Sequence, residues 1–235
     1  VRQVHGGLDA GGIALVFDNG EVAVPARNGE VWVVDPQGRR LGAVVSRHRG
    51  AVAIARLASG LLVSAGSDPS LQVFSRDGAQ RRTVTLDDGI LAGPVVGDDD
   101  TIWVVRADGM LLGLSAGGRV RARARLQGRA MKSIPALGRD GALRLGTGGD
   151  ELVCIGPDGS ARWRLQVDGR LGPVTLDADD LALAVSSPGV LYGVESDGKR
   201  RFRVRVNAGG APRPVLGAGG VIYIASENGT LSAWK

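Results

Sequence analysis

The sequence has few of the residues that usually carry redox, thiol or metal chemistry. Of its 235 residues, one is cysteine and two are histidine, and only 4% are aromatic. A single cysteine excludes an internal disulfide, and no motif supplies the two histidines with partners for a metal or catalytic site. No apolar run approaches the roughly 20 residues of a transmembrane helix, and there is no basic-then-apolar signal peptide.

The isolated reactive groups are each expected to have a structural role. Cys154 lies in the apolar stretch LVCI and is expected to be a small buried residue rather than a reactive thiol. His5 and His48 lie in VHGG and RHRG, where we expect exposed loops. The acidic run Asp98–Asp100 resembles a Ca²⁺ loop, but it lacks EF-hand spacing, and a solvated turn is expected.

Catalytic signatures are also missing. Neither a G-x-S-x-G elbow nor a Walker loop occurs, and the glycines precede strands rather than helices. The sequence therefore predicts no catalytic residue, no metal site and no cofactor.

Glycine, by contrast, is abundant, with 38 residues, and it follows a regular spacing. Turn signals such as Asn28-Gly29, Asp108-Gly109 and Asn228-Gly229 belong to a series at positions 29, 69, 109, 149, 189 and 229, so each step is 40 residues. A second series of turns follows at nearly the same offset, from Pro36-Gln37-Gly38 onward. These dipeptides favour tight hairpin turns because such turns need positive φ angles.

Four short strands per repeat of about 40 residues are typical of a β-propeller blade. We therefore predict an all-β fold, a six-bladed β-propeller of four-stranded antiparallel blades in a single domain over residues 1–235. The predicted blades span residues 13–46, 53–86, 94–126, 134–167, 173–206 and 214–235. The last blade lacks a fourth strand, and we expect residues 1–5 (VRQVH) to supply it and close the ring.

The repeats also resemble a known family. IYIASENGTLSAW, VLYGVESDGKRRF, LVCIGPDGSARW and VWVVDPQGRR are similar to the PQQ-like (quinoprotein alcohol dehydrogenase-like) propeller repeat, and all six copies fit in register. The closing tryptophan of that repeat occurs here as Trp163, with Phe202 in its place one copy later. The family includes the propeller lipoprotein of outer-membrane barrel assembly, although its members usually have eight blades.

The resemblance implies a bacterial, extracytoplasmic setting, periplasmic or associated with the outer membrane. It also suggests two activities. One is a non-catalytic scaffold for protein–protein interaction within a larger assembly, and the other is a quinone- or small-ligand-binding enzyme. Quinoprotein dehydrogenases commonly carry a vicinal disulfide over the cofactor, which a chain with one cysteine cannot form. We therefore expect the scaffold and not an enzyme.

Charge gives the remaining pattern. The formal net charge is +5, and most Lys and Arg residues fall on the fourth strands and their adjoining turns. RVRARARL, ARWRLQV and RFRVRV place arginines on one face of a strand and apolar residues on the other. The arginines of this pattern are Arg121, Arg123, Arg125, Arg162, Arg164, Arg201, Arg203 and Arg205.

Two interpretations of these strands remain open. Long cationic side chains on an edge strand prevent other chains from pairing with it, or they form a flank that docks an acidic protein or another anionic polymer. Nucleic acid is not expected, because few aromatic residues interleave the basic ones. The loops between blades form a second candidate partner surface, through His48, Arg129, Met131, Lys132, Arg170 and Arg213. The sequence identifies neither the partner nor an oligomeric state.

Overall fold

The computed structural model describes residues 14–26, 28–45, 48, 53–78, 81–128, 133–206 and 208–235. Within these ranges the fold is all-β, and its helical structure is limited to one 3₁₀ turn at Ala218–Gly220. The strands form six antiparallel sheets, five with four strands and one with three. No helix among the described residues has the length and apolar character needed to cross a bilayer.

The chain divides into two compact units. The first comprises Val1–Ala107 and Gly113–Arg121, and the second comprises Asp108–Leu112 and Ala122–Lys235. The first two sheets lie wholly in the first unit and consist of β1 (Leu15–Val16), β2 (Val22–Pro25), β3 (Glu30–Val34) and β4 (Arg40–Val45), then β5 (Ala53–Arg56), β6 (Leu62–Ala65), β7 (Ser70–Phe74) and β8 (Arg81–Thr85).

The third sheet contributes residues to both units, and the last three sheets lie in the second unit. Their strands are β9 (Ile90–Val96), β10 (Ile102–Arg106), β11 (Met110–Leu114) and β12 (Val120–Arg125); β13 (Ala136–Leu137), β14 (Leu143–Gly146), β15 (Glu151–Ile155) and β16 (Ala161–Gln166); β17 (Thr175–Leu176), β18 (Ala182–Ser186), β19 (Val190–Val194) and β20 (Arg200–Arg205); and β21 (Val215–Leu216), β22 (Ile222–Ala225) and β23 (Leu231–Trp234).

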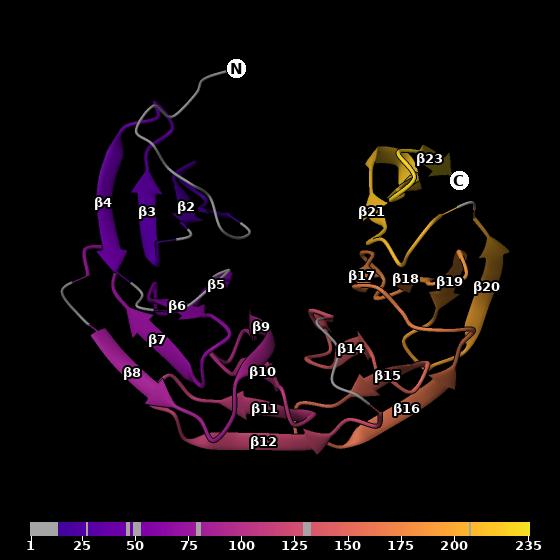
Figure 1. The fold of residues 1–235 in the computed structure, drawn as a ribbon, viewed down its shortest axis with the longest axis horizontal. Coiled ribbons are helices and arrows are strands. Elements are labelled where there is room, and N and C mark those ends of the chain that lie inside the picture. Colours follow the sequence, from indigo (N-terminus) through magenta and orange to yellow (C-terminus); the bar gives the residue numbers. More distant parts are fainter. Residues whose placement is uncertain are drawn as a thin grey trace. The chain divides into compact units, whose positions relative to one another are not determined.

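In every sheet the strands follow one another in chain order, as the 40-residue repeat predicts for propeller blades. The fourth strands β16 and β20 lie at the edges opposite the short first strands β13 and β17 (Figure 1). The middle strands β18 and β19 are buried throughout, whereas β20 is mostly exposed. Apolar burial therefore concentrates in the inner strands, and the fourth strand carries the polar surface.

Glycine at the turn between the third and fourth strands allows neighbouring sheets to pack closely. Gly198 has a φ of +89°, and a Cβ atom there would lie 2.7 Å from Cγ of Trp163 in the preceding sheet. The indole Nε1 of Trp163 donates a 2.8 Å hydrogen bond to the carbonyl of Ser196 in the same turn. Gly118 lies in the same way against Val84 in the first unit. Trp163, the aromatic residue predicted at the end of its repeat, therefore packs between adjacent sheets.

The structure corrects one detail of the predicted strands. The third sheet begins at Ile90 rather than at residue 94, because β9 continues through a bulge and pairs Ala92 with Val105 and Ile90 with Arg106. The sixth sheet has three strands among the described residues. Residues 1–5, predicted to complete it, lie outside the described part of the chain, so closure by this segment and the single domain stay predictions.

Candidate functional site

The arginines of the three fourth strands lie on the exposed face that the sequence predicts. In β12, Arg121, Arg123 and Arg125 are exposed, while Ala122 and Ala124 between them are buried. The same alternation places the arginines of β16 and β20 outward and Trp163 and Phe202 inward. Trp163 packs on the core of the fourth and fifth sheets, and Phe202 packs on the core of the fifth and sixth.

Most of these arginines pair with carboxylates of their own chain, which the sequence did not predict. Arg121 donates 2.8 Å hydrogen bonds to the Asp99 carbonyl and to Oγ1 of Thr101. The carboxylate pairs are Arg121 with Asp99 (3.5 Å), Arg162 with Asp140 (2.5 Å), Arg164 with Glu151 (3.3 Å), Arg201 with Glu195 (2.5 Å) and Arg203 with Asp168. Each acidic partner lies in a turn, in a loop or at the start of a neighbouring strand.

The pairs also hold the carboxylates in the ionised form. Hydrogen bonds from Arg203 and then from the Tyr192 hydroxyl lower the pKa of Asp168 below its usual value of 3.8. The hydrogen bond that Arg203 donates to Asp168 in turn raises the pKa of Arg203. Because both groups are solvent-exposed, this ion pair orients the Arg203 side chain but adds little to the free energy of unfolding.

Arg123, Arg125 and Arg205 differ from the other five. No hydrogen bond or ion pair joins their side chains to another residue of the described ranges. Arg200 on β20 likewise forms no hydrogen bond or ion pair within these ranges. Arg123 and Arg125 lie two residues apart on β12.

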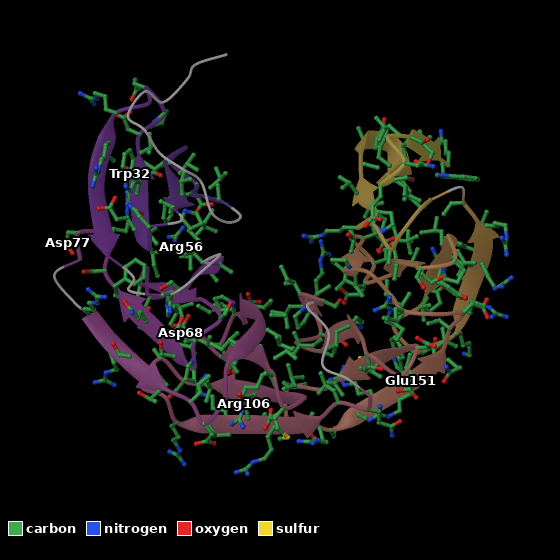
Figure 2. All side chains as sticks on the ribbon, viewed as in Figure 1. Trp32, Arg56, Asp68, Asp77, Arg106 and Glu151 are labelled. Carbon is green, nitrogen blue, oxygen red and sulfur yellow. The ribbon has the colours of Figure 1, made fainter. Side chains whose placement is uncertain are left out.

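The prediction that His48 is an exposed loop residue is wrong. Its side chain is fully buried, with Nδ1 2.9 Å from a carboxylate oxygen of Asp68 and Nε2 3.1 Å from both the carbonyl and Oγ of Ser64. Ser70 adds a hydrogen bond to Asp68, which lies in the loop between β6 and β7 (Figure 2). Asp68 and Ser64 hold the imidazole ring in the second sheet. No sequence motif predicted these partners.

Ser64, His48 and Asp68 have the order of contacts found in a hydrolytic triad, with the serine on Nε2 and the carboxylate on Nδ1. Nucleophilic attack also requires that a substrate reach the serine hydroxyl. Ser64 is fully buried in the middle of β6, and Nε2 also faces its carbonyl oxygen. The arrangement is therefore suited to fixing the loop that carries His48, not to attacking a substrate.

The remaining residues of the predicted loop surface are only partly described. Arg170 and Arg213 are exposed, and Nε of Arg213 lies 3.4 Å from Oγ1 of Thr175. Arg129, Met131 and Lys132 lie outside the described residues. The loop surface consequently stays a prediction.

The ion pair of a buried arginine with an exposed aspartate in the fourth sheet was not predicted from the sequence. Arg144 on β14 is fully buried and donates from Nη1 and Nη2 to the two carboxylate oxygens of Asp140, at 2.6 and 3.1 Å. Burial opposes ionisation of Asp140, but the hydrogen bonds from Arg144 and Ala142 outweigh it and lower its pKa. Cys154 pairs with Arg144 across the strands and is buried, as expected. Burial raises the pKa of its thiol, which makes it less reactive.

Metal chemistry has no evident basis in the part of the chain that the structure describes, where no group of three or more His, Cys, Asp or Glu side chains is arranged to hold an ion. The carboxylates of Asp98–Asp100 act in the turn instead. Asp99 accepts hydrogen bonds from the backbone and hydroxyl of Thr101, and Asp100 accepts one from the Ala58 backbone N–H at 2.5 Å. Asp100 therefore joins the second and third sheets. The sequence predicted only a solvated turn here.

Solved structures with the same fold come from proteins of different kinds. BamB from Moraxella catarrhalis is similar with a TM-score of 0.78 and 17% identity, over 97% of this chain and 73% of that chain. A catalytically inactive H270A virginiamycin B lyase from Staphylococcus aureus, solved with quinupristin, has a TM-score of 0.76 and 17% identity, over 97% and 85%. The computationally designed Ika8 protein has a TM-score of 0.79 and 14% identity, over 96% and 70%.

These similarities show the fold, a β-propeller, since at such identities the same architecture serves unrelated functions. No curated protein matches the chain. A family model described as outer membrane protein assembly factor BamB matches residues 108–235, which is more than half of the chain. The repeat motifs and this match agree, and the chain belongs to the PQQ-like propeller family that this model represents.

Proposed function

We propose that this chain is a non-catalytic scaffold that binds other protein subunits in an extracytoplasmic, outer-membrane-associated assembly of a bacterium. The match of residues 108–235 to a family described as an outer membrane protein assembly factor carries the proposal. A rigid set of sheets with exposed turns and edges is suited to this task, because loops and edges on a fixed framework present binding groups without folding costs.

Two features of the structure support binding over catalysis. The triad-like arrangement of Ser64, His48 and Asp68 is closed to substrate, and it holds a loop. Several exposed arginines, including Arg123 and Arg125, have no partner within the described chain and keep their charge for an acidic surface.

The pairing pattern supports applying the two interpretations of the fourth strands to different arginines. Arg162, Arg164, Arg201 and Arg203 are tied to carboxylates and protect their edges. We assign partner contact to Arg123, Arg125 and Arg205, together with the exposed loop residues Arg170 and Arg213.

The proposal is tested by chemical cross-linking in the native cell envelope, followed by purification of this chain and identification of the linked proteins. We expect subunits of outer-membrane protein assembly to be cross-linked. The double variant Arg123→Gln/Arg125→Gln should capture less of them, while Arg201→Gln, which removes a paired arginine, serves as the matched control.

Two results would contradict the proposal. One is a chain that purifies without any reproducible protein partner. The other is a bound quinone or a turnover of small molecules that survives removal of all associated proteins. Aggregation of the double variant with unchanged capture would assign these arginines to edge protection instead.

A further inference from the structure

Three neighbouring cavities lie at one end of the second sheet, within the first unit. The first, of about 250 Å³, lies between Phe17 and Arg56, the second, of about 620 Å³, lies beside Arg76 and Asp77, and the third, of about 330 Å³, lies at Arg81 and Arg82. The first two share Gly60 and Arg76, and the last two share Leu61. We call this row of cavities the arginine groove; Figure 2 labels Arg56 and Asp77, which line it.

The arginines at the beginning of the groove are already neutralised. Arg56 pairs with Asp18 at 3.0 Å, and Arg76 pairs with Glu21. Both guanidinium groups also lie over the ring of Phe17, with Cζ of Arg76 4.9 Å and Cζ of Arg56 5.8 Å from its centroid. These contacts fix the shape of the wall and leave little net charge there.

The other end of the groove has no such compensation. Arg81 donates to the neutral Oε1 of Gln72 at 2.5 Å, and no described residue forms a hydrogen bond or an ion pair with the Arg82 side chain. No carboxylate lines this cavity, and Ala79 and Gln80, which precede β8 in the sequence, carry none either. Arg81 and Arg82 are consecutive on β8, so their side chains leave the strand on opposite faces. Arg82, whose Nη1 lies beside Gly117, therefore faces this cavity without a counter-charge, which favours an anion.

The opposite wall adds neutral donors. It is the turn Ala116–Gly117 of the third sheet, whose backbone N–H groups form no hydrogen bond with a described residue. A Cβ atom on Gly117 would lie 3.1 Å from Nη1 of Arg82, so the absence of a side chain leaves the guanidinium accessible from the turn. The rest of the lining is apolar and consists of Leu61, Val73 and Phe74.

We propose that the arginine groove binds an extended acidic segment of a partner protein, with a carboxylate held by Arg82 and the turn Ala116–Gly117. This inference rests on the proposed scaffold function and specifies that the partner protein carries an acidic segment. The carboxylate matches the fork of a guanidinium group, and an apolar side chain of the same segment is accommodated on Leu61.

The lining favours a peptide over the other anionic polymers. Phe17 and Phe74, the aromatic residues of the groove, are 5% and 1% exposed, so neither offers a face on which a base or a sugar ring can stack. An extended peptide needs only the carboxylate site and the apolar lining, both of which are present.

The test measures binding of a fluorescently labelled peptide, acetyl-Glu-Glu-Leu-Glu-Glu-amide, by anisotropy at about 0.15 M salt, where diffuse surface charge is largely screened. Its all-glutamine counterpart is the neutral control. We expect the acidic peptide to bind and the double variant Arg81→Gln/Arg82→Gln to weaken it roughly tenfold or more, because hydrogen bonds to charged groups are lost. Arg201→Gln/Arg203→Gln, with the same change in charge, should bind as the unchanged protein does.

A second variant tests the site from its other wall. Gly117→Glu places a carboxylate beside Arg82, at a position whose backbone is not left-handed, and it should abolish peptide binding while the melting temperature stays near that of the unchanged protein. Four results would overturn the inference: no binding of the acidic peptide, equal losses in both arginine double variants, peptide binding unchanged by Gly117→Glu in the folded protein, and tighter, Arg82-dependent binding of a heparin hexasaccharide or an oligodeoxythymidine. If subunits are cross-linked in the envelope but any of these results is obtained, the proposed scaffold function stands and peptide binding in the arginine groove is rejected.

Discussion

Asp180 accepts the backbone N–H of Arg139 through both carboxylate oxygens, each at 3.1 Å, and so joins the turn before β18 to the turn before β14. Asp100 makes the equivalent contact with Ala58 in the first unit. Both aspartates have positive φ angles, 63° and 61°, at a turn position where four other copies have glycine, namely Gly20, Gly60, Gly141 and Gly220. Aspartate tolerates this conformation better than most residues and adds a bond between sheets.

We predict that the two roles of Asp180 can be separated by substitution. Asp180→Gly suits the turn and loses only the hydrogen bonds, so it should cost about 1 kcal/mol of unfolding free energy. Asp180→Ala also incurs backbone strain and should cost about 1–2 kcal/mol more. Urea denaturation measures both values.

Gly141→Ala is the matched control, because Gly141 occupies the same turn position with a φ of 70° and a new Cβ would lie 3.9 Å from its nearest neighbour. Gly141→Ala should lower the free energy of unfolding only by the cost of the backbone strain. Equal stability of Asp180→Gly and the unchanged protein would show that the bond between the sheets contributes nothing.

A second prediction concerns the close contact of Gly198 with Trp163. Gly198→Ala introduces an unfavourable φ and a clash with the indole, so it should destabilise the protein by the strain of about 1–2 kcal/mol plus an overpacking cost of about 1–3 kcal/mol. Trp163 fluorescence should change in the folded state, since the ring must move. Thermal and urea unfolding give the stability.

Gly229→Ala separates the two contributions. Its φ is +82°, close to that of Gly198, but a Cβ atom there meets nothing within 4 Å. If both variants lost the same stability, the packing of Gly198 on Trp163 would have no energetic role.

These contacts show which parts of the structure a repeat can reveal. The 40-residue spacing placed the strands well. For example, the blade predicted over residues 173–206 contains the observed β17–β20, from Thr175 to Arg205. Alternation of arginine with apolar residues gave the exposed face of β12 correctly. Both patterns follow from the two-residue period of a strand, which is local in sequence.

Contacts between repeats were not predictable in the same way. Arg203 meets Asp168, which is 35 residues away, and His48 meets Asp68 from another loop. Nothing in the local pattern distinguishes an arginine with a carboxylate across the edge, such as Arg203, from one without, such as Arg205. Burial of His48 likewise depends on its contacts with Ser64 and Asp68, which lie 16 and 20 residues further along the chain.

We predict a pH dependence that arises from the ion pair of Asp140 with the buried Arg144. The folded-state pKa of Asp140 lies below its ordinary value of 3.8, so the unfolded chain binds that proton more tightly than the folded one does. The stabilisation is therefore present above pH 3.8 and is lost as the pH falls through the lower folded-state value. Asp140→Asn leaves Arg144 without its counter-charge and should cost about 3 kcal/mol near pH 7.

Urea denaturation at a series of pH values from about 7 to about 3 provides the measurement. The difference in unfolding free energy between the unchanged protein and Asp140→Asn should be constant above pH 5 and should narrow below pH 4. A difference that stayed constant down to the lowest pH would mean that Asp140 does not titrate with a lowered pKa.

The last prediction is that Ser64 is inert although it lies 3.1 Å from Nε2 of His48. A fluorophosphonate reagent, which labels activated serines, should leave the folded protein unlabelled, because Ser64 is fully buried. His48→Ala should cost about 3 kcal/mol of stability, since it opens a cavity and removes the partner of Asp68. Ser64→Ala should cost about 1 kcal/mol, as expected for one hydrogen bond. Stoichiometric labelling that disappears in both variants would instead identify Ser64 as a nucleophile and reopen the enzymatic interpretation.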